Sequence, residues 1–579
     1  MGLKCYLELV ISVLRSRSES NGWRTVLQPG GAAAAFFQLD SWAYEKVRLV
    51  YRQIDFMLSS PPTCAGSPPR FPRQQGLPTP ASAGSASNRL GALAPWALVL
   101  GCGILARVFY HFTYYPWWCG DSGGYTFPWF RWTHHLVDLG NRTPVYPLFL
   151  GLVQWLAGSP PVADGLTIWS AESTVFLQGV LGLAATGLLY STLRRLPVRP
   201  CLALAAAVVF ALIPAVSEFE MLILTQALSL CALVLAAALF AGAMREAGQG
   251  KRSWRLPVAA GATTGIAGLI RPENLVFGMV LAVAVILVAA RLYFLESARE
   301  KAWAVGRVAL LGVLAAAPPV LAWMSFNWVS VDEFAVKTQS GWDRAGPVYN
   351  LFDRVGPEDW LLGQIVEQNY RAHNRNTIRR DHLWVDGVWA IMAHSPALPI
   401  ERRKGHWPLM DASRYVAQVS GKLMRKYPKL WLENAADNFR RDTFDFEYEQ
   451  PPLAPGDPSS VTGESVVKSI PLWRLAGRAN RLFAPLLESF YIIMLAFVLA
   501  GPILIGKGRA PEVVVRDGTV WALGLGILGT YMAACLFASF NRRYSEPFLG
   551  VMVICAAYAA ERALELFSKR KRAGPAADR

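Results

Sequence analysis

The chain has 579 residues, of which 53% are hydrophobic and only 17% are charged. Soluble domains carry about 25% charged residues, whereas many windows of about 20 residues in this chain are almost free of charge, which is the length that a helix needs to cross a bilayer. This composition excludes a soluble globular protein and predicts an all-α polytopic membrane protein. The net charge of +16 would suit a nucleic-acid-binding protein, but the basic residues cluster between apolar runs, as cytoplasmic loops do. No nucleic acid is therefore expected as a partner.

The N-terminal segment, residues 1–89, differs from the rest of the chain. It starts weakly amphipathic and then becomes rich in Pro, Ser, Gly and Ala, a composition that cannot bury a core and predicts disorder. Glu8 interrupts the opening apolar stretch, which makes it a poor signal peptide, and Tyr6 stands where N-myristoylation requires Ser or Thr. We expect either a disordered cytoplasmic segment or an over-extended translation start.

Apolar runs predict about ten membrane-spanning helices. They lie near residues 91–110, 173–193, 200–217, 221–242, 255–270, 274–292, 306–327, 484–506, 517–539 and 545–563. Basic loops follow the second, fourth, sixth and eighth helices, and a basic tail, residues 564–579, follows the tenth. The positive-inside rule places these segments, and both termini, in the cytoplasm. The loops after odd-numbered helices are then extracytoplasmic.

Two extracytoplasmic segments are long. The first outer loop, residues 111–172, contains an apolar stretch, 143–158, which is too short to span and predicts an interfacial helix. Residues 328–483 form a polar, cysteine-free insert between the transmembrane parts 90–327 and 484–563. Helical periodicity with a basic face predicts a small, mostly helical domain on the outer membrane surface. The basic face fits anionic headgroups or glycan, and it fits simple solvation equally well.

The unusual polar motifs all fall in the predicted outer loops. Asp121 lies in GDSGGY of the first loop, and Glu218 and Glu220 lie in SEFE of the second. Arg271 and Glu273 lie in LIRPEN of the third, and the last loop holds NRRYSEP. Charged groups at a membrane edge are costly unless they are solvated or have a task. Their convergence on one face predicts an active site there.

These motifs, in this order and with this sidedness, resemble the GT-C superfamily of integral-membrane glycosyltransferases. The likeness is closest to the branch of protein O-mannosyltransferases and lipid A aminoarabinose transferases, and it covers roughly residues 91–563, with the insert matched only loosely. The matching pieces are GDSGGY, RTPVYPLFL, EMLILTQALSL, GLIRPEN and RRYSEPFLG. The resemblance implies a sugar donor on a polyprenyl phosphate, transfer with inversion, and an acceptor that is a membrane lipid, a cell-envelope glycan or a protein. It also implies a location in the plasma (inner) membrane.

The chain departs from the family pattern at two positions. Many relatives carry Asp-Glu in the first loop, where this chain has Asp121-Ser122. Relatives often carry Thr-Glu where this chain has Thr225-Gln226. If that Glu has a role in relatives, Glu220 is the nearest substitute here.

The chemistry of such a transfer suggests roles for the motif residues. Asp121 is the candidate general base that takes the acceptor proton; the alternative is that it only caps a short helix beginning at Ser122. Arginine suits the phosphate of the leaving group because it forms bidentate hydrogen bonds. The candidate substrate-binding residues are Arg142, Tyr146, Arg271, Glu273, Arg542, Arg543 and Tyr544. For the arginines the alternatives are snorkelling at the interface or ion pairs with Glu273 or Glu546.

Glu218 and Glu220 are two residues apart and cannot share one helix face. We expect Glu220 to reach the site as a second catalytic carboxylate, which orients the acceptor or joins Asp121 around a divalent cation, and Glu218 to face water. No protein metal site is expected otherwise. The eight cysteines are scattered without ligand or disulfide spacing, and the adjacent His134 and His135 are poorly spaced for chelation.

A competing hypothesis is a transporter or flippase of lipid-linked sugar. Transporters place ionisable residues near the bilayer midplane on broken helices, often in repeated halves. In this chain the polar motifs lie at helix ends on one side, and no repeat is apparent. A further alternative is an oligosaccharide or a phosphoethanolamine transferase; the latter would need a metal-ligand cluster in a soluble domain, which the insert lacks. The pattern therefore favours a glycosyltransferase, without naming the sugar or the acceptor.

Overall fold

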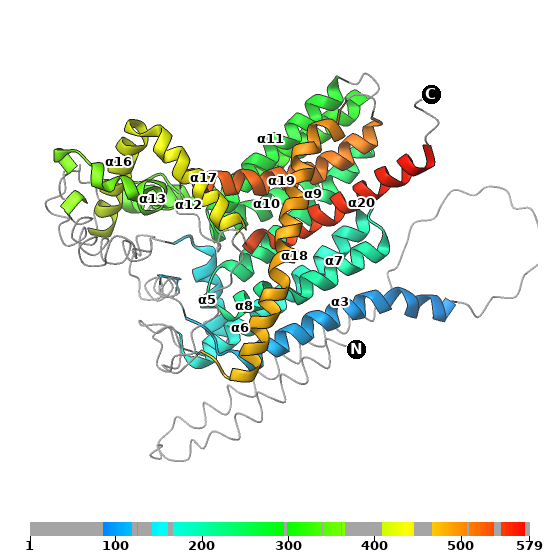
Figure 1. Ribbon diagram of the computed structural model, residues 1–579, viewed down its shortest axis with the longest axis horizontal. Coiled ribbons are helices and arrows are strands. Elements are labelled where there is room, and N and C mark those ends of the chain that lie inside the picture. The colour runs from blue at the N-terminus through cyan, green and yellow to red at the C-terminus, as the bar shows by residue number, and fades with distance from the viewer. Residues whose placement is uncertain are drawn as a thin grey trace, which may run out of the picture. The chain divides into compact units, whose positions relative to one another are not determined.

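The computed structural model describes the chain in segments. These are residues 85–118, 124–125, 142–159, 166–294, 298–338, 340–359, 362–364, 408–444, 466–506, 509–537 and 546–573. The described residues are almost entirely helical, and their only β-structure consists of two isolated bridges. The chain divides into two compact units, residues 1–93 and 94–579, and the second unit holds the helical bundle (Figure 1). Disorder was expected for residues 1–89: residues 1–84 lie outside the described residues, and for residues 85–89 the expectation is wrong, because they form the first turn of α3.

Among the described residues, nine helical segments are long and apolar enough to cross a membrane, so the protein is an integral multi-pass membrane protein. They are Leu93–Thr113 of α3 (Ser85–Thr113), α6 (Ile168–Arg195), Pro200–Met221 formed by α7 (Pro200–Leu212) with α8 (Pro214–Met221), α9 (Gln226–Gly248), α11 (Glu273–Tyr293), α12 (Arg299–Val331), α18 (Ile470–Leu504), α19 (Pro511–Phe537) and Glu546–Ser568 of η6 (Glu546–Phe548) and α20 (Leu549–Ala573). The fifth expected span is also a helix, α10 (Arg255–Ile270), but its 16 residues rise only about 24 Å. Each of the ten expected spans therefore contains a helix, and nine of them have the length of a span within the described residues.

Local sequence explains where these helices begin. Thr167 caps α6 by accepting a hydrogen bond from the backbone N–H of Ser170 at 3.2 Å. Pro200 starts α7, where its fixed φ and missing N–H are no disadvantage. Pro214 separates α7 from α8, because a proline interrupts the hydrogen-bond ladder of a continuing helix. The short α8 that results carries both carboxylates of the SEFE motif.

Contacts between distant segments place the helix connections at two ends of the bundle. At one end, Arg199 pairs with Glu561 at 3.0 Å, Arg291 donates to the carbonyl of Ile505, and Lys301 pairs with Glu512. The first contact joins the connection after α6 to the end of α20, and the other two join the basic connections after α11 and α18 to each other. Asp517 of α19 pairs with Arg562 of α20 at 2.9 Å, which places both groups at the same end, and we call this the basic end.

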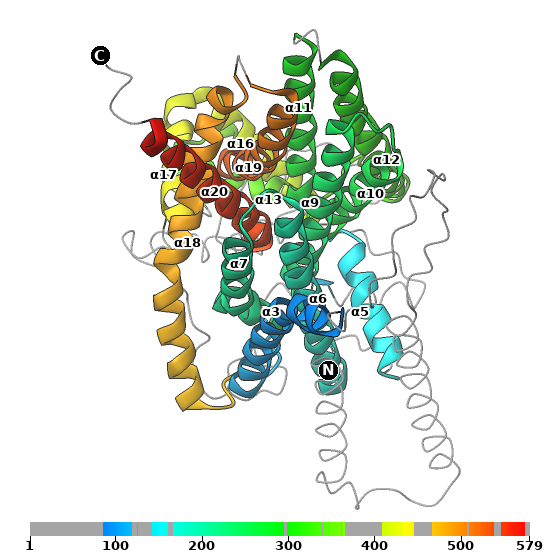
Figure 2. The ribbon, with the colours of Figure 1, turned by 90° about the vertical axis from the view of Figure 1, so that its right-hand side faces the viewer.

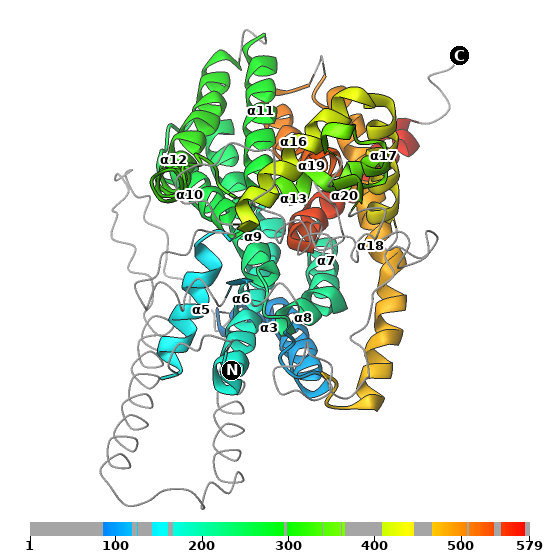
Figure 3. The same ribbon diagram turned by 90° about the vertical axis from the view of Figure 1, so that its left-hand side faces the viewer.

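The opposite end holds the connections expected outside the cell. Tyr114 forms a backbone bridge with Val467, and Trp117 forms one with Leu222. We call this the motif end. Figures 2 and 3 show the N-terminal end of α18 beside the C-terminal end of α3. The alternation of connections that loop charge predicted is therefore present in the structure.

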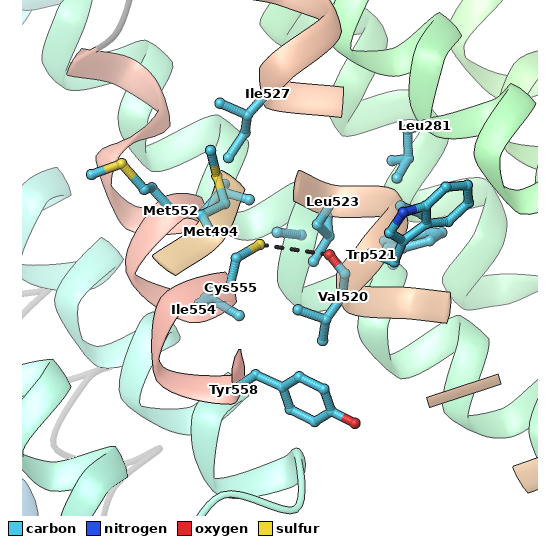
Figure 4. Packing of buried hydrophobic residues seen from close by; sticks show 14 of the residues in the cluster. Leu281, Met494, Val520, Trp521, Leu523, Ile527, Met552, Ile554, Cys555 and Tyr558 are labelled. Atoms are coloured by element: carbon cyan, nitrogen blue, oxygen red, sulfur yellow. Dashed lines mark hydrogen bonds between the residues drawn. The ribbon is translucent and has the colours of Figure 1, made fainter. Parts of the chain in front are cut away.

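The bundle core is packed from α9, α11, α18, α19 and α20. Figure 4 shows its centre, where Cys555 of α20 donates to the carbonyl of Val520 in α19 at 3.7 Å. The short α10 packs against α12 at very close range, because a Cβ on Gly261 would lie 2.1 Å from the carbonyl oxygen of Gly312. Small residues at such crossings let helix backbones approach closely in membranes. This close packing seats α10 inside the bundle despite its length.

The two long outer segments contain the helices that the sequence predicts. The apolar stretch of the first loop forms α5 (Val145–Leu156), which at 12 residues is too short to span. The insert contains α13 (Ser340–Ala345), η2 (Gly346–Arg354), η3 (Pro357–Asp359), α16 (Pro408–Lys426) and α17 (Pro428–Phe444). A small apolar cluster joins α13, η2, α16 and α17, and Trp431 of α17 donates its indole N–H to the carbonyl of Leu536. The insert therefore rests on the end of α19.

α18 differs most from its expected extent. α18 begins at Ile470 rather than near residue 484, so the last part of the segment assigned to the insert belongs to a transmembrane helix. Pro471 occupies its first turn, where proline is compatible with a helix. The three arginines near its start obscured this beginning in the hydropathy pattern.

Candidate functional site

The motif end of the bundle contains a buried ion pair between α3 and α8. The guanidinium Nη2 of Arg107 donates to Oε1 of Glu220 at 2.6 Å, and both side chains are almost fully buried. The same guanidinium donates through Nε to the carbonyl of Gly179 in α6 and through Nη1 to the carbonyl of Gly103. Both members lie within candidate spans, where an unpaired charge would be costly. Each charge therefore depends on the other for its place in the bundle.

Glycine makes room for this pair. A Cβ on Gly182 of α6 would lie 1.7 Å from Oε1 of Glu220 and 2.5 Å from Nη2 of Arg107. Such distances are far below van der Waals contact, so only glycine fits at this position. The second carboxylate oxygen of Glu220, Oε2, has no hydrogen-bond partner among the described residues. Glu220 is thus held by Arg107 through Oε1, and its Oε2 is an acceptor that no described residue uses.

A chain of side chains connects this pair to the first loop. Gln178 of α6 donates its amide to the carbonyls of Glu220 and Leu222, at 2.8 and 2.7 Å, and accepts from the hydroxyl of Tyr146 at 2.9 Å. The Tyr146 ring packs edge-on against Tyr125 with ring centroids 5.1 Å apart. The guanidinium carbon of Arg142 lies over the Tyr125 ring, 4.7 Å from the ring centroid. Two predicted substrate-binding residues, Arg142 and Tyr146, are thereby coupled to Glu220.

Asp121 itself lies outside the described residues, but both of its flanks are placed by contacts. On one side, Trp117 donates its backbone N–H to the carbonyl of Met221 and accepts from the N–H of Ile223, at 2.8 and 3.0 Å. On the other side, Gly124 lies so close to Arg142 that a Cβ would be 2.9 Å from the guanidinium Nε. The segment carrying Asp121 therefore starts and ends at the same buried network.

The LIRPEN motif meets the first loop at the junction of α10 and α11. Thr143 donates its hydroxyl to the carbonyl of Ile270 at 3.0 Å, directly before Arg271. Arg271 pairs with Glu273 at 3.1 Å, and both side chains remain partly exposed. Lys337 lies close enough to Glu273 to interact with it electrostatically. This junction holds two cations near one carboxylate, which suits an anionic group.

Glu218 points away from Glu220, as their spacing predicts, but it does not face water. It is only 7% exposed and accepts from Nδ2 of Asn480 in α18 at 3.0 Å and from the hydroxyl of Tyr114 at 3.4 Å. Burial and the neighbouring carboxylate raise the pKa of Tyr114 above its ordinary value, so the phenol stays protonated and can donate. The expectation that Glu218 is solvated is wrong, because α18 begins early enough to cover it.

The structure therefore gathers five of the predicted site residues at the motif end: Arg142, Tyr146, Glu220, Arg271 and Glu273. The other predicted residues, Asp121, Arg542, Arg543 and Tyr544, lie outside the described residues, as do His134 and His135. Glu546, which belongs to the last motif, is described and buried at the start of η6.

Sequence reasoning missed Arg107, although its signal was present. It is an arginine inside an apolar window, where a charge requires a partner.

The described residues contain no group of three His, Cys, Asp or Glu side chains that could hold a metal ion. Glu220 and Glu273 each have one carboxylate oxygen without a hydrogen-bond partner in the described part of the chain. These oxygens are the available ligands if a divalent cation binds here.

Residues 98–331 match the family of dolichyl-phosphate-mannose-protein mannosyltransferases. The match covers less than half of the chain, and it begins in α3 and ends with α12, so it contains Arg107, Glu220 and the junction at Arg271. It confirms, for these residues, the resemblance to GT-C membrane glycosyltransferases that the motifs indicated. No curated protein sequence matches the chain.

Solved structures offer more distant likenesses. The oligosaccharyltransferase AglB from Archaeoglobus fulgidus, in complex with an inhibitory peptide and a dolichol-phosphate, is 12% identical, with a TM-score of 0.45 over 85% of this chain and 53% of that one. The chain thus spans about half the length of that protein. ArnT from Cupriavidus metallidurans is 16% identical in the apo state, with a TM-score of 0.33 over 78% of each chain, and 15% identical when bound to undecaprenyl phosphate, with a TM-score of 0.29 over 78% of this chain and 77% of that one.

Proposed function

We propose that this protein is an integral-membrane glycosyltransferase that moves a sugar from a polyprenyl-phosphate donor to a hydroxyl acceptor. The observation that carries the proposal is the family match, whose residues include the buried network at the motif end. The sugar is a hexose or pentose, and the acceptor is a lipid, a cell-envelope glycan or a protein. The motif end faces the extracytoplasmic side of the plasma membrane, because the basic connections occupy the opposite end.

In the proposed reaction the acceptor oxygen attacks the anomeric carbon of the donor. The bond from that carbon to the phosphate oxygen breaks, and the polyprenyl phosphate leaves with the electron pair, which gives inversion. The acceptor proton passes to the carboxylate of Asp121, the proposed general base. A positioned base of this kind contributes roughly 10²–10⁴-fold to the rate. Asp121 suits the role because both flanks of its segment are fixed at the buried network.

The leaving phosphate requires positive charge. Arg271 and Arg142 flank the Thr143–Ile270 hydrogen bond, which brings the first loop to the α10–α11 junction. We propose that these arginines bind the donor phosphate, with Arg542 and Arg543 of the last motif completing the set. Tyr146, Tyr544 and Glu273 border the substrate in this proposal. Guanidinium groups that are already fixed before the reaction stabilise the charge on the leaving phosphate without reorganising. Such preorganised electrostatic stabilisation is usually the largest single contribution to the rate.

Glu220 has a narrower role than a base in this proposal. Its Oε1 is committed to Arg107, so proton uptake would weaken a buried ion pair. Its Oε2 is the atom available to orient the acceptor or to ligate a divalent cation together with Asp121. Dialysis against a chelator, followed by return of Mg²⁺, Mn²⁺ or Ca²⁺, tests the cation: restored transfer supports it, and unchanged transfer removes it.

The test of the function uses the full chain in proteoliposomes with a panel of polyprenyl-phosphate sugars. One readout follows sugar appearing on added lipid, glycan or peptide acceptors, and a second follows lipid-linked sugar crossing the bilayer. We expect transfer from one donor class and no movement across the bilayer. Movement without transfer would replace the proposal with a flippase. Transfer that is unchanged by Arg271→Gln, with Arg194→Gln at the basic end as control, would remove Arg271 from the donor site.

A further inference from the structure

The N-terminal part of α18 carries three arginines that the proposed reaction does not use. Arg474, Arg478 and Arg481 are spaced by four and three residues, which places them on one face of the helix. We call these three residues the arginine stripe. All three side chains are exposed, and no hydrogen bond or ion pair joins them to any other described residue.

The opposite face of the same helix segment is buried against the bundle. Ala476 lies in a cluster with Tyr110 and Tyr114, and Asn480 donates to Glu218 at 3.0 Å. These contacts fix the rotation of the helix, so the arginine stripe points away from the protein interior. Beside the stripe, Leu475 is 51% exposed and Leu482 is 73% exposed. The outward surface therefore combines cations with large apolar side chains.

The arginine stripe lies at the motif end, away from the basic connections. The chain enters α18 at the motif end, where Lys468 donates its backbone N–H to the carbonyl of Thr113 at 2.8 Å. The basic connections lie at the other end of the bundle, as the positive-inside rule requires. Three cations at the motif end that have no ion-pair partner among the described residues thus require a different physical reason. An anionic surface outside the protein would provide one.

The helix also has the length to reach such a surface. Its 35 residues rise about 52 Å, whereas the hydrocarbon core is about 30 Å thick. Its first residues therefore extend beyond the core, and Arg474 to Arg481 span about 10 Å along the axis. That distance is comparable with the headgroup layer of one leaflet, about 5–8 Å. Leu482, at the inner end of the stripe, then meets the acyl-chain boundary, and Leu475 lies about 10 Å further out, beside Arg474.

We propose that the arginine stripe binds the phosphates of anionic phospholipid headgroups in the leaflet at the motif end. Guanidinium groups recognise phosphate through bidentate hydrogen bonds, and their aliphatic stems cover apolar surface. The donor phosphate is a different ligand in a different place, because its proposed arginines lie at the α10–α11 junction and the stripe faces outward. The stripe thus anchors α18, whose buried face holds Glu218, to the lipid surface.

The experiment measures lipid bound to the purified full chain by native mass spectrometry, with equal amounts of phosphatidylglycerol and phosphatidylcholine supplied in detergent. We expect wild type to retain phosphatidylglycerol preferentially. In the triple variant R474Q/R478Q/R481Q the ratio of bound phosphatidylglycerol to bound phosphatidylcholine should fall at least tenfold. Each basic side chain near an anionic surface contributes about 1 kcal/mol, or about fivefold. Single Arg→Gln variants should show graded losses and provide the same readout if the triple variant folds poorly.

Two controls separate the arginine stripe from charge in general. The variant R474K/R478K/R481K keeps three cations and should keep most of the preference. The variant R425Q/K426Q/K429Q removes the same charge from exposed positions of α16 and α17 in the insert and should behave as wild type. Absence of a phosphatidylglycerol preference in wild type, its survival in the glutamine variant, or an equal loss in the insert variant would each overturn the proposal.

Discussion

The two ends of the bundle bury charge in different ways. At the basic end, Asp517 is fully buried and both of its carboxylate oxygens are bonded, one to the Tyr558 hydroxyl and the other to Nη2 of Arg562 at 2.9 Å. At the motif end, Glu220 is just as inaccessible, but only one of its oxygens is bonded. The first arrangement is saturated, and the second leaves an acceptor unused.

This difference separates a structural role from a functional one. A buried carboxylate with every oxygen satisfied has no capacity for another ligand, and its loss affects folding. A buried carboxylate with one unsatisfied oxygen is destabilised by the loss of its hydration, and a bound group that donates to this oxygen offsets the loss. Substitutions at the basic end should therefore change stability alone, whereas substitutions at the motif end should change stability and transfer together.

The largest effect is expected from Arg107→Met, which leaves Glu220 buried without its cation. Breaking a buried ion pair in this way costs about 3–5 kcal/mol of unfolding free energy. The double variant Arg107→Met/Glu220→Met removes both charges and should recover most of that loss. Transfer should stay low in the double variant, because Oε2 is gone. Thermal unfolding and transfer of all variants, including Glu220→Met, check this; full transfer by the double variant would make the pair purely structural.

Gly182→Ala should cost about 3 kcal/mol through overpacking of the same pair, since the new Cβ would lie 1.7 Å from Glu220 Oε1. Gly187→Ala in the same helix is the matched control, because its Cβ would meet Trp96 at an ordinary 3.7 Å. Thermal unfolding of the two purified variants checks the comparison. Equal midpoints would show that α6 and α8 are not packed as described.

Asp517→Asn should lower the stability by about 2 kcal/mol, since a charged hydrogen bond to Arg562 is weakened. Transfer per folded molecule should be unchanged, because this group lies at the basic end. Glu512→Gln, at an exposed ion pair with Lys301, serves as a control that should cost under about 1 kcal/mol. The measurement combines unfolding curves with turnover per folded protein, and a selective loss of turnover in Asp517→Asn would erase the distinction between the two ends.

The smallest effect is expected from Tyr146→Phe, which removes one hydrogen bond to Gln178 at 2.9 Å. The cost is about 1 kcal/mol, because Gln178 keeps both of its bonds to the 220–222 backbone. If Tyr146 also borders the substrate, as proposed, KM should rise while kcat changes little. Thermal unfolding measures the loss of stability, and steady-state kinetics with varied donor concentration measure KM and kcat. A change in stability without any change in KM would limit Tyr146 to a supporting role.

The sequence predicted the helices well because apolar length is a strong signal, and its errors have local causes. The beginning of α18 was misplaced because three arginines interrupt its hydropathy, although they lie on an exposed face that packing does not constrain. The burial of Glu218 depends on Asn480, which is distant in sequence and belongs to that misplaced segment. Loop charge, by contrast, predicted correctly which of the described connections share an end of the bundle. The side of the membrane that each end faces stays a prediction.

The site was predictable in its motifs but not in its pairing. Glu220 was a candidate by its position in an outer loop, whereas its partner Arg107 lies 113 residues away in sequence and belongs to no motif. The glycines that admit the pair, such as Gly182, look in sequence like any other small residue of a membrane helix. Only the packed arrangement of α3, α6 and α8 shows why they are needed.

The most direct test of a catalytic motif end is transfer by Asp121→Asn in proteoliposomes, measured under single-turnover conditions together with donor binding and thermal unfolding. Asparagine keeps the size of the side chain and removes the base. Our account predicts a fall in the transfer rate of about 10²–10⁴-fold, with donor binding and the unfolding midpoint unchanged. Transfer at the wild-type rate would contradict it and would remove Asp121 from the mechanism.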